Sequence, residues 1–144
     1  MSTCTFFGHR DCPDTVKPRL REVLKDLIEN HSVDTFYVGN NGAFDRLVQF
    51  VLQELLREHP HISYAVVLER LPEKRDGEDY YDTILPEGIE AVHPHYALVW
   101  RNRWMLRQSD FVVTCITRSW GGAAQFAEAA RRQGKTVINL AERR

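Results

Sequence analysis

Residues 35–56, TFYVGNNGAFDRLVQFVLQELL, join a short apolar run to a longer amphipathic one through a loop of glycine and asparagine. The run 35–38 is rich in β-branched and aromatic residues, which is typical of a buried strand. Beyond the loop, one face of a helix is marked at helical spacing by Phe44, Leu47, Val48, Val51, Leu52, Leu55 and Leu56. This strand, loop and helix form the basic unit of a parallel α/β sheet.

The same alternation continues along the chain. Further strands are predicted over 3–7, 62–68, 111–115 and 136–140. Further helices are predicted from about 15–17 onward, over about 96–108 and over 122–132, with Gly134 as a C-terminal helix cap. The pattern predicts one domain over 1–144, a Rossmann-like three-layer α/β/α fold with a mainly parallel sheet of five or more strands.

Residues 70–94 interrupt this rhythm, because the stretch is rich in charge, proline and glycine. One interpretation is a lid in which Tyr80 or Tyr81 stacks on a base, and the other is a solvated connection. Glu69, just before it, would either bind a ribose hydroxyl or pair with Arg70 or Arg75.

Composition limits the function classes. The 19 basic and 20 acidic residues nearly cancel, so nucleic acid is not a favoured partner and neither is a membrane. Three cysteines without a CxxC pair argue against a disulfide scaffold and for a reducing compartment. No secretion signal or membrane span is recognised, so a cytoplasmic location is expected. Histidines and cysteines lack metal-site spacing, and no metal or cofactor is expected.

Three loops that follow predicted strands carry the candidate ligand-binding residues. In an open parallel sheet, ligands bind beyond the carboxyl ends of the strands, where these loops would meet. A purely structural turn is the alternative for each loop taken singly. The candidates are Gly8, His9, Arg10, Gly39, Asn40, Asn41, Asp45, Ser119, Trp120, Gly121 and Gly122.

The turn at Gly121 and Gly122 is the best phosphate candidate of the three. It precedes a predicted helix, whose free N–H groups and dipole attract anions. Arg10, on the opposing loop, could add a bidentate contact to the phosphate.

Two charged side chains on helices are candidate catalytic residues. Arg101 shares a face with apolar residues, so it would snorkel, form a structural ion pair or reach the ligand. Glu128 either serves the site or pairs with Arg132 at the helix surface.

Four motifs, CTFFGHRD (4–11), GNNGAFD (39–45), RNRWMLRQSD (101–110) and SWGGAAQFAE (119–128), occur in this order. Together they resemble the SLOG superfamily, which includes YpsA-like proteins, DprA/Smf proteins and the Lonely Guy phosphoribohydrolases. The likeness covers about 3–140 and is strongest to YpsA-like and other small bacterial members. It implies a Rossmann-like fold, nucleotide-derived ligands at the glycine turn and a homo-oligomer, a dimer or higher.

The base-cleaving members of that superfamily carry PGGxGTxxE and an upstream arginine–lysine pair. Here the two glycines and Glu128 match, and Arg101 stands at the arginine, while Asn102 replaces the lysine. Trp120, Ala124 and Gln125 replace proline, glycine and threonine. The resemblance therefore implies that Arg101 and Glu128 would be the catalytic residues, but the altered motif favours binding without cleavage.

The leading hypothesis is a protein that binds or senses a nucleotide-derived small molecule, a nucleoside monophosphate or an ADP-ribose-like compound. The alternative is a phosphoribohydrolase that releases the base from nucleoside 5′-monophosphates. A third possibility is a DNA-associated protein of the DprA type, which the balanced charge disfavours.

Overall fold

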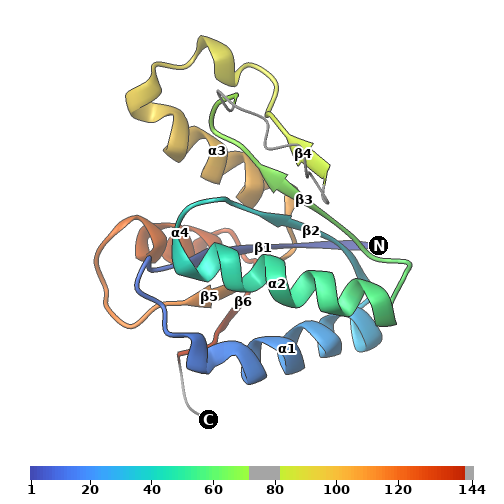
Figure 1. Ribbon diagram of the computed structural model, residues 1–144. Coiled ribbons are helices and arrows are strands. Elements are labelled where there is room, and N and C mark those ends of the chain that lie inside the picture. Colours follow the sequence, from blue (N-terminus) through green and yellow to red (C-terminus); the bar gives the residue numbers. More distant parts are fainter. Residues whose placement is uncertain (72–81, 142–144) are drawn as a thin grey trace.

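The computed structural model describes residues 1–71 and 82–141, which form a six-stranded sheet with helices on both faces (Figure 1). All neighbouring strands are parallel, in the order β4-β3-β2-β1-β5-β6. The predicted fold class is confirmed. The strands are β1 (Ser2–Gly8), β2 (Val33–Val38), β3 (Ser63–Val67), β4 (Asp82–Ile84), β5 (Phe111–Cys115) and β6 (Thr136–Asn139). The helices are α1 (Lys17–Asn30), α2 (Gly42–Glu58), α3 (Pro94–Gln108) and α4 (Gly122–Arg132), with 3₁₀ turns η1 (Asp14–Val16) and η2 (Ile89–Ala91).

The order in which strands are added to the sheet reverses at β1. From β1 the chain proceeds outward through β2, β3 and β4, and then returns to place β5 on the other side of β1. The loops that leave β1 and β5 therefore run toward opposite faces of the sheet. Such a switch point is where open α/β sheets form their ligand-binding crevice.

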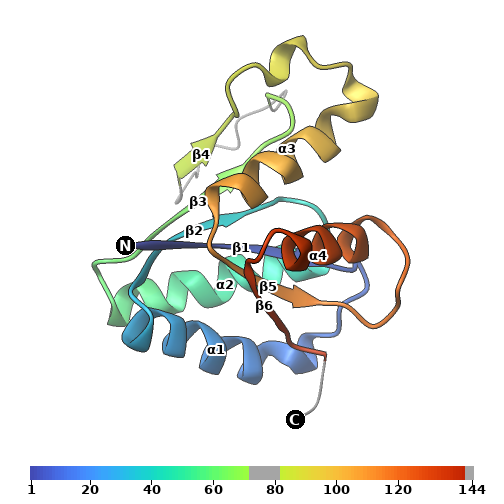
Figure 2. The ribbon, with the colours of Figure 1, turned by 180° about the vertical axis from the view of Figure 1, so that it is seen from behind.

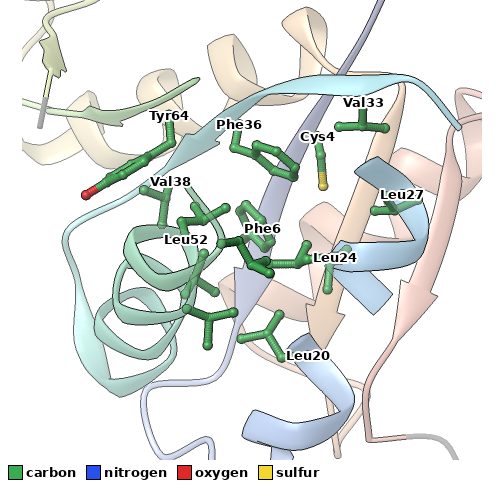
Figure 3. Close-up of a cluster of buried hydrophobic side chains, with 14 of the residues drawn as sticks. Cys4, Phe6, Leu20, Leu24, Leu27, Val33, Phe36, Val38, Leu52 and Tyr64 are labelled. Carbon is green, nitrogen blue, oxygen red and sulfur yellow. The ribbon is translucent and has the colours of Figure 1, made fainter. Parts of the chain in front are cut away.

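Each face of the sheet is covered by two helices, α1 and α2 on one face and α3 and α4 on the other (Figure 2). The larger core lies under α1 and α2, where Phe6 and Phe36 meet the leucines of both helices (Figure 3). Phe7, the next residue along β1, points to the opposite core beside Met105 and Leu106. Each fully buried side chain of this size contributes about 1.5–3 kcal/mol, so the two cores hold the sheet between its helices.

The stretch 70–94 contains structure that the periodicity did not predict. Asp82–Ile84 forms the edge strand β4 beside β3, and Ile89–Ala91 forms a 3₁₀ turn. A three-residue edge strand needs little apolar sequence, since only Ile84 turns toward the core. Tyr80 and Tyr81, the proposed lid residues, lie outside the described residues.

Among the described residues, no helix has the length and apolar character required to cross a membrane.

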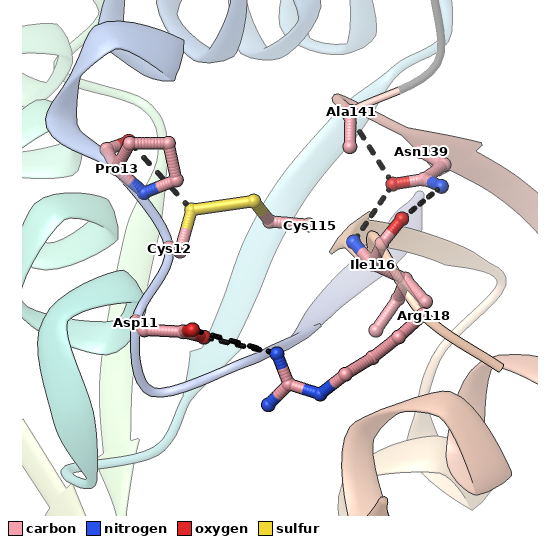
Figure 4. The surroundings of a disulfide bond; sticks show 8 residues. All are labelled: Asp11, Cys12, Pro13, Cys115, Ile116, Arg118, Asn139 and Ala141. Atoms are coloured by element: carbon pink, nitrogen blue, oxygen red, sulfur yellow. Dashed lines mark hydrogen bonds and ion pairs between the residues drawn. A yellow bond between two sulfur atoms is a disulfide. The ribbon is translucent and has the colours of Figure 1, made fainter. Parts of the chain in front are cut away.

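Cys12 and Cys115 form a disulfide bond, which the argument against a disulfide scaffold did not predict (Figure 4). Their Cα atoms are 6.3 Å apart, and 103 positions separate them in sequence. The odd cysteine count misled because Cys4 remains a buried free thiol in the core. The bond ties the loop after β1 to the end of β5, the two strands at the switch point.

Reduction of this disulfide should destabilise the fold by about 2–5 kcal/mol, because it releases a long loop in the unfolded chain. Urea denaturation with and without dithiothreitol measures the effect. The double variant Cys12→Ser/Cys115→Ser should be insensitive to the reductant, and Cys4→Ala should keep the wild-type response. An unchanged midpoint in wild-type protein whose thiols titrate as reduced would contradict the prediction.

Candidate functional site

A cavity of about 340 Å³ lies at the switch point, bounded by the end of β1, by the loop after β5 and by α2, α3 and α4. All three loops singled out from the sequence reach it. Of the predicted residues, its lining includes Gly8, His9, Arg10, Asn41, Asp45, Arg101, Gly121 and Gly122. It is also lined by Phe6, Phe7, Leu98, Asn102, Met105, Arg118 and Ala123.

The charges that line this cavity are unequal. Arg10, Arg101 and Arg118 are basic, and His9 adds an imidazole. Asp45 is the single acidic residue among the lining residues. The cavity therefore attracts anions, although the whole chain carries a formal net charge of only −1.

Arg101 is buried, with 3% of its surface exposed, and its guanidinium is held by several partners. Nη1 donates to Asn40 Oδ1 at 3.1 Å, to Glu69 Oε2 at 3.2 Å and to the Val67 carbonyl at 3.4 Å. Nε and Nη2 both donate to Asn102 Oδ1, at 3.2 and 2.9 Å. The structural ion pair predicted as one alternative is thus present.

A ribose contact of Glu69 stays a prediction, and Arg75 lies outside the described residues, but Glu69 has an ion-pair partner that the sequence did not predict. It pairs with Arg101 rather than with Arg70, and the carboxylate is mostly covered. Burial lowers the pKa of Arg101, whereas Asp45 and Glu69 oppose that shift. Because arginine stays charged in proteins, this cation is compensated by acidic groups from two neighbouring elements.

Asp45 lies in the first turn of α2 and is 8% exposed. Its Oδ2 accepts the Asn41 backbone N–H at 2.9 Å, which caps the helix. Burial raises the pKa of Asp45 to about 6; the Asn41 hydrogen bond and Arg101 oppose this rise, and Glu69 adds to it. Within the described residues, Oδ1 makes no hydrogen bond and is not enclosed by protein.

Gly39 allows these charged groups to approach the backbone. A Cβ at this position would lie 2.8 Å from Asp45 Oδ2 and 2.9 Å from Arg101 Nη2. Any larger residue would push the carboxylate and the guanidinium away from the end of β2. Gly39 and Asn40 do not line the cavity. Asn40 accepts a hydrogen bond from Arg101, and Gly39 leaves room for Asp45 and Arg101, which do line it.

The amino terminus of α4 forms the opposite wall. Gly121 has φ of 100°, which glycine adopts readily, and no side chain caps the helix. A Cβ at Gly121 or Gly122 would meet nothing within 4 Å, so the first N–H groups of α4 adjoin open space. Such a helix terminus is suited to an anion.

Two further side chains complete this wall. Arg118 pairs with Asp11 at 3.3 Å (Figure 4). Its guanidinium carbon also lies 4.5 Å from the ring centroid of Trp120. His9 is 5% exposed, and its Nε2 is buried without a hydrogen-bond partner among the described residues. Burial, and next the charge of Arg118, lower the pKa of His9. A buried polar atom that lacks a partner is a costly feature, which a ligand could relieve.

The remaining predicted residues lie outside the cavity lining. Ser119 and Trp120 are exposed in the loop before α4. Glu128 is exposed as well, and it approaches Arg131 Nη1 at 3.9 Å rather than Arg132. Arg101 and Glu128 are therefore not brought together in one cavity. No group of described residues could hold a metal ion.

Sequence reasoning missed Arg118 and Asn102 as lining residues. Arg118 could have been found, because it belongs to the same loop as Ser119 and Trp120. Asn102 was noted only as a replacement for a lysine, whereas its carbonyl in fact orients Arg101.

Asp45→Asn should stabilise the protein above pH 6. The pKa of Asp45 is raised on folding, so the folded state favours the protonated form, and its stability falls as pH rises from about 4 to 6. Above that range the ionised carboxylate costs on the order of 3 kcal/mol, which asparagine avoids. Urea denaturation at pH 7.5 should give a higher midpoint for the variant, with little difference at pH 4. The exposed Glu22→Gln is the matched control, and a destabilised Asp45→Asn at pH 7.5 would refute the account.

No protein-family model matches the chain, and no curated protein matches its sequence. The fold is similar to the X-ray structure of DNA processing protein A (DprA) from Streptococcus pneumoniae, with a TM-score of 0.69 over 95% of this chain and 15% identity. The match covers 49% of that protein, so this chain spans about half its length. The likeness shows the fold alone; the resemblance to the SLOG superfamily, and the narrower likeness to YpsA-like proteins, stay predictions.

Proposed function

We propose that the protein binds a nucleotide-derived, phosphate-bearing small molecule in the cavity at the switch point. The observation that carries the proposal is that the uncapped start of α4, Arg10, Arg118 and His9 line one cavity, and that Nε2 of His9 has no hydrogen-bond partner among the described residues. Helix N–H groups and arginines are the donors that phosphates take most often.

The remainder of the lining suits the rest of a nucleotide. Leu98, Met105 and Phe7 supply an apolar surface for a base or sugar, beside a few polar groups. Small-molecule sites commonly combine such an apolar lining with a small number of placed polar groups. A nucleoside monophosphate or an ADP-ribose-like compound has both parts.

Binding without cleavage is favoured over the phosphoribohydrolase alternative. The guanidinium of Arg101 donates its hydrogen bonds to acceptors within the protein, and Glu128 is exposed outside the cavity lining. A cleaving site would need both groups at the ribose. Release of free base is therefore the less expected outcome of the test below.

AMP, GMP, NAD, ADP-ribose and cyclic ADP-ribose are the compounds to test, by calorimetry together with liquid chromatography and mass spectrometry of the bound and free fractions. At least one compound should bind and be recovered intact. Arg10→Ala should weaken that affinity by about 10- to 100-fold, the usual loss for a charge-assisted hydrogen bond. Arg132→Ala, at the far end of α4, should leave it unchanged. If none of the five compounds binds, the proposal fails.

A DNA-associated role is the second candidate, and its support is the fold likeness to a DNA-processing protein. Against it stands the formal net charge of −1, since backbone binding to DNA requires many basic contacts. Fluorescence anisotropy with a single-stranded oligonucleotide at 50 and 200 mM salt would test it. Binding that weakens steeply with salt would favour this role, and no binding at the lower salt would exclude it.

A further inference from the structure

We propose that Asp45 is a specificity-determining residue that accepts a hydrogen bond from a sugar hydroxyl, so that the ligand is a phosphorylated ribose compound rather than a simple phosphate. This inference rests on the proposed function and adds a second contact to the same site. The amino terminus of α4 would hold the phosphate, and Asp45 would accept a hydrogen bond from a hydroxyl group of the sugar.

The contacts of Asp45 leave one oxygen available to a ligand. Oδ2 accepts the Asn41 backbone N–H, and a Cβ on Gly39 would lie 2.8 Å from it. Oδ1 has no hydrogen-bond partner among the described residues and is not enclosed by protein atoms. Because the residue is 8% exposed overall and lines the cavity, this accessible oxygen faces the cavity space.

The surroundings of Asp45 select a neutral donor over a cationic one. An ionised carboxylate only accepts hydrogen bonds, so the ligand must supply an O–H or N–H group. Arg101 approaches Gly39 together with Asp45, and Arg10 and Arg118 line the same cavity. An ammonium group would meet this positive field, whereas a hydroxyl would not. A sugar phosphate has both properties, because it is an anion that carries neutral hydroxyl donors.

The energetics of Asp45 point the same way. Burial raises its pKa to about 6, so near neutral pH the fold retains a carboxylate in an unfavourable environment. Helix capping alone does not account for this, because asparagine is an equally good acceptor for the Asn41 N–H. A charged group kept at a cost to stability inside a cavity is a common property of functional sites.

The test compares AMP with 2′,3′-dideoxyadenosine 5′-monophosphate, which lacks both ribose hydroxyls, by calorimetry at pH 7.5. Wild-type protein should bind AMP about 10- to 100-fold more tightly, the value of a hydrogen bond to a charged group. In Asp45→Asn the ratio of the two affinities should fall toward one. The helix cap survives in this variant, and its fold is checked by the urea midpoint.

The outcomes separate the two proposals. Equal binding of the two nucleotides by wild-type protein would overturn the role of Asp45 and leave the proposed function standing. An unchanged ratio in Asp45→Asn would assign the hydroxyl contact to another residue and would also overturn it. If neither nucleotide binds but ADP-ribose does, the same comparison is made with ADP-ribose and its dideoxy analogue. If no compound binds, the proposed function fails and this inference fails with it.

Discussion

The buried guanidinium of Arg101 is the constraint on which the edge of the sheet depends. A cation removed from water must be compensated where it lies, or the fold loses several kcal/mol. Here the compensation comes from Asn40 after β2, from Val67 and Glu69 at the end of β3, and from Asn102 on α3 itself. One side chain on α3 thereby fixes the ends of two strands that α3 would otherwise only cover.

This arrangement divides the charged residues of the cavity into two kinds. Arg101 is engaged by protein acceptors, so its role is to position the loops and to set the field that Asp45 experiences. Arg10 and Arg118 line the same cavity, and the side chain of Arg118 is paired with the exposed Asp11 and stacked on the ring of Trp120. Exposed pairs of this kind are weak, so an incoming anion could compete for Arg118 at little cost.

The fold and much of the site could be predicted from the sequence, since both depend on local pattern. Apolar strands followed by amphipathic helices predicted the parallel sheet, and glycine-rich loops after strands predicted the edge where His9, Asp45 and Gly121 now lie. The failures depend on pairs that are distant in the chain. Arg101 visibly needed a partner, yet Glu69 lies 32 positions away, and Cys12 is joined to Cys115 across 103. Nothing local marks such partners, nor the short strand β4 with its single inward apolar residue.

Two links between the loops after β1 and β5 preorganise the basic residues of the cavity before a ligand binds. The disulfide joins Cys12 to Cys115 at the end of β5, and the ion pair between Asp11 and Arg118 joins the same two loops, one residue before Cys12 and three residues after Cys115 (Figure 4). His9 and Arg10 precede the first anchor, and the start of α4 follows the second. Loops held in this way lose less conformational entropy on binding, so more of each phosphate contact appears as affinity. The disulfide is the stronger of these two links, and Arg101 holds the ends of β2 and β3 that border the same cavity.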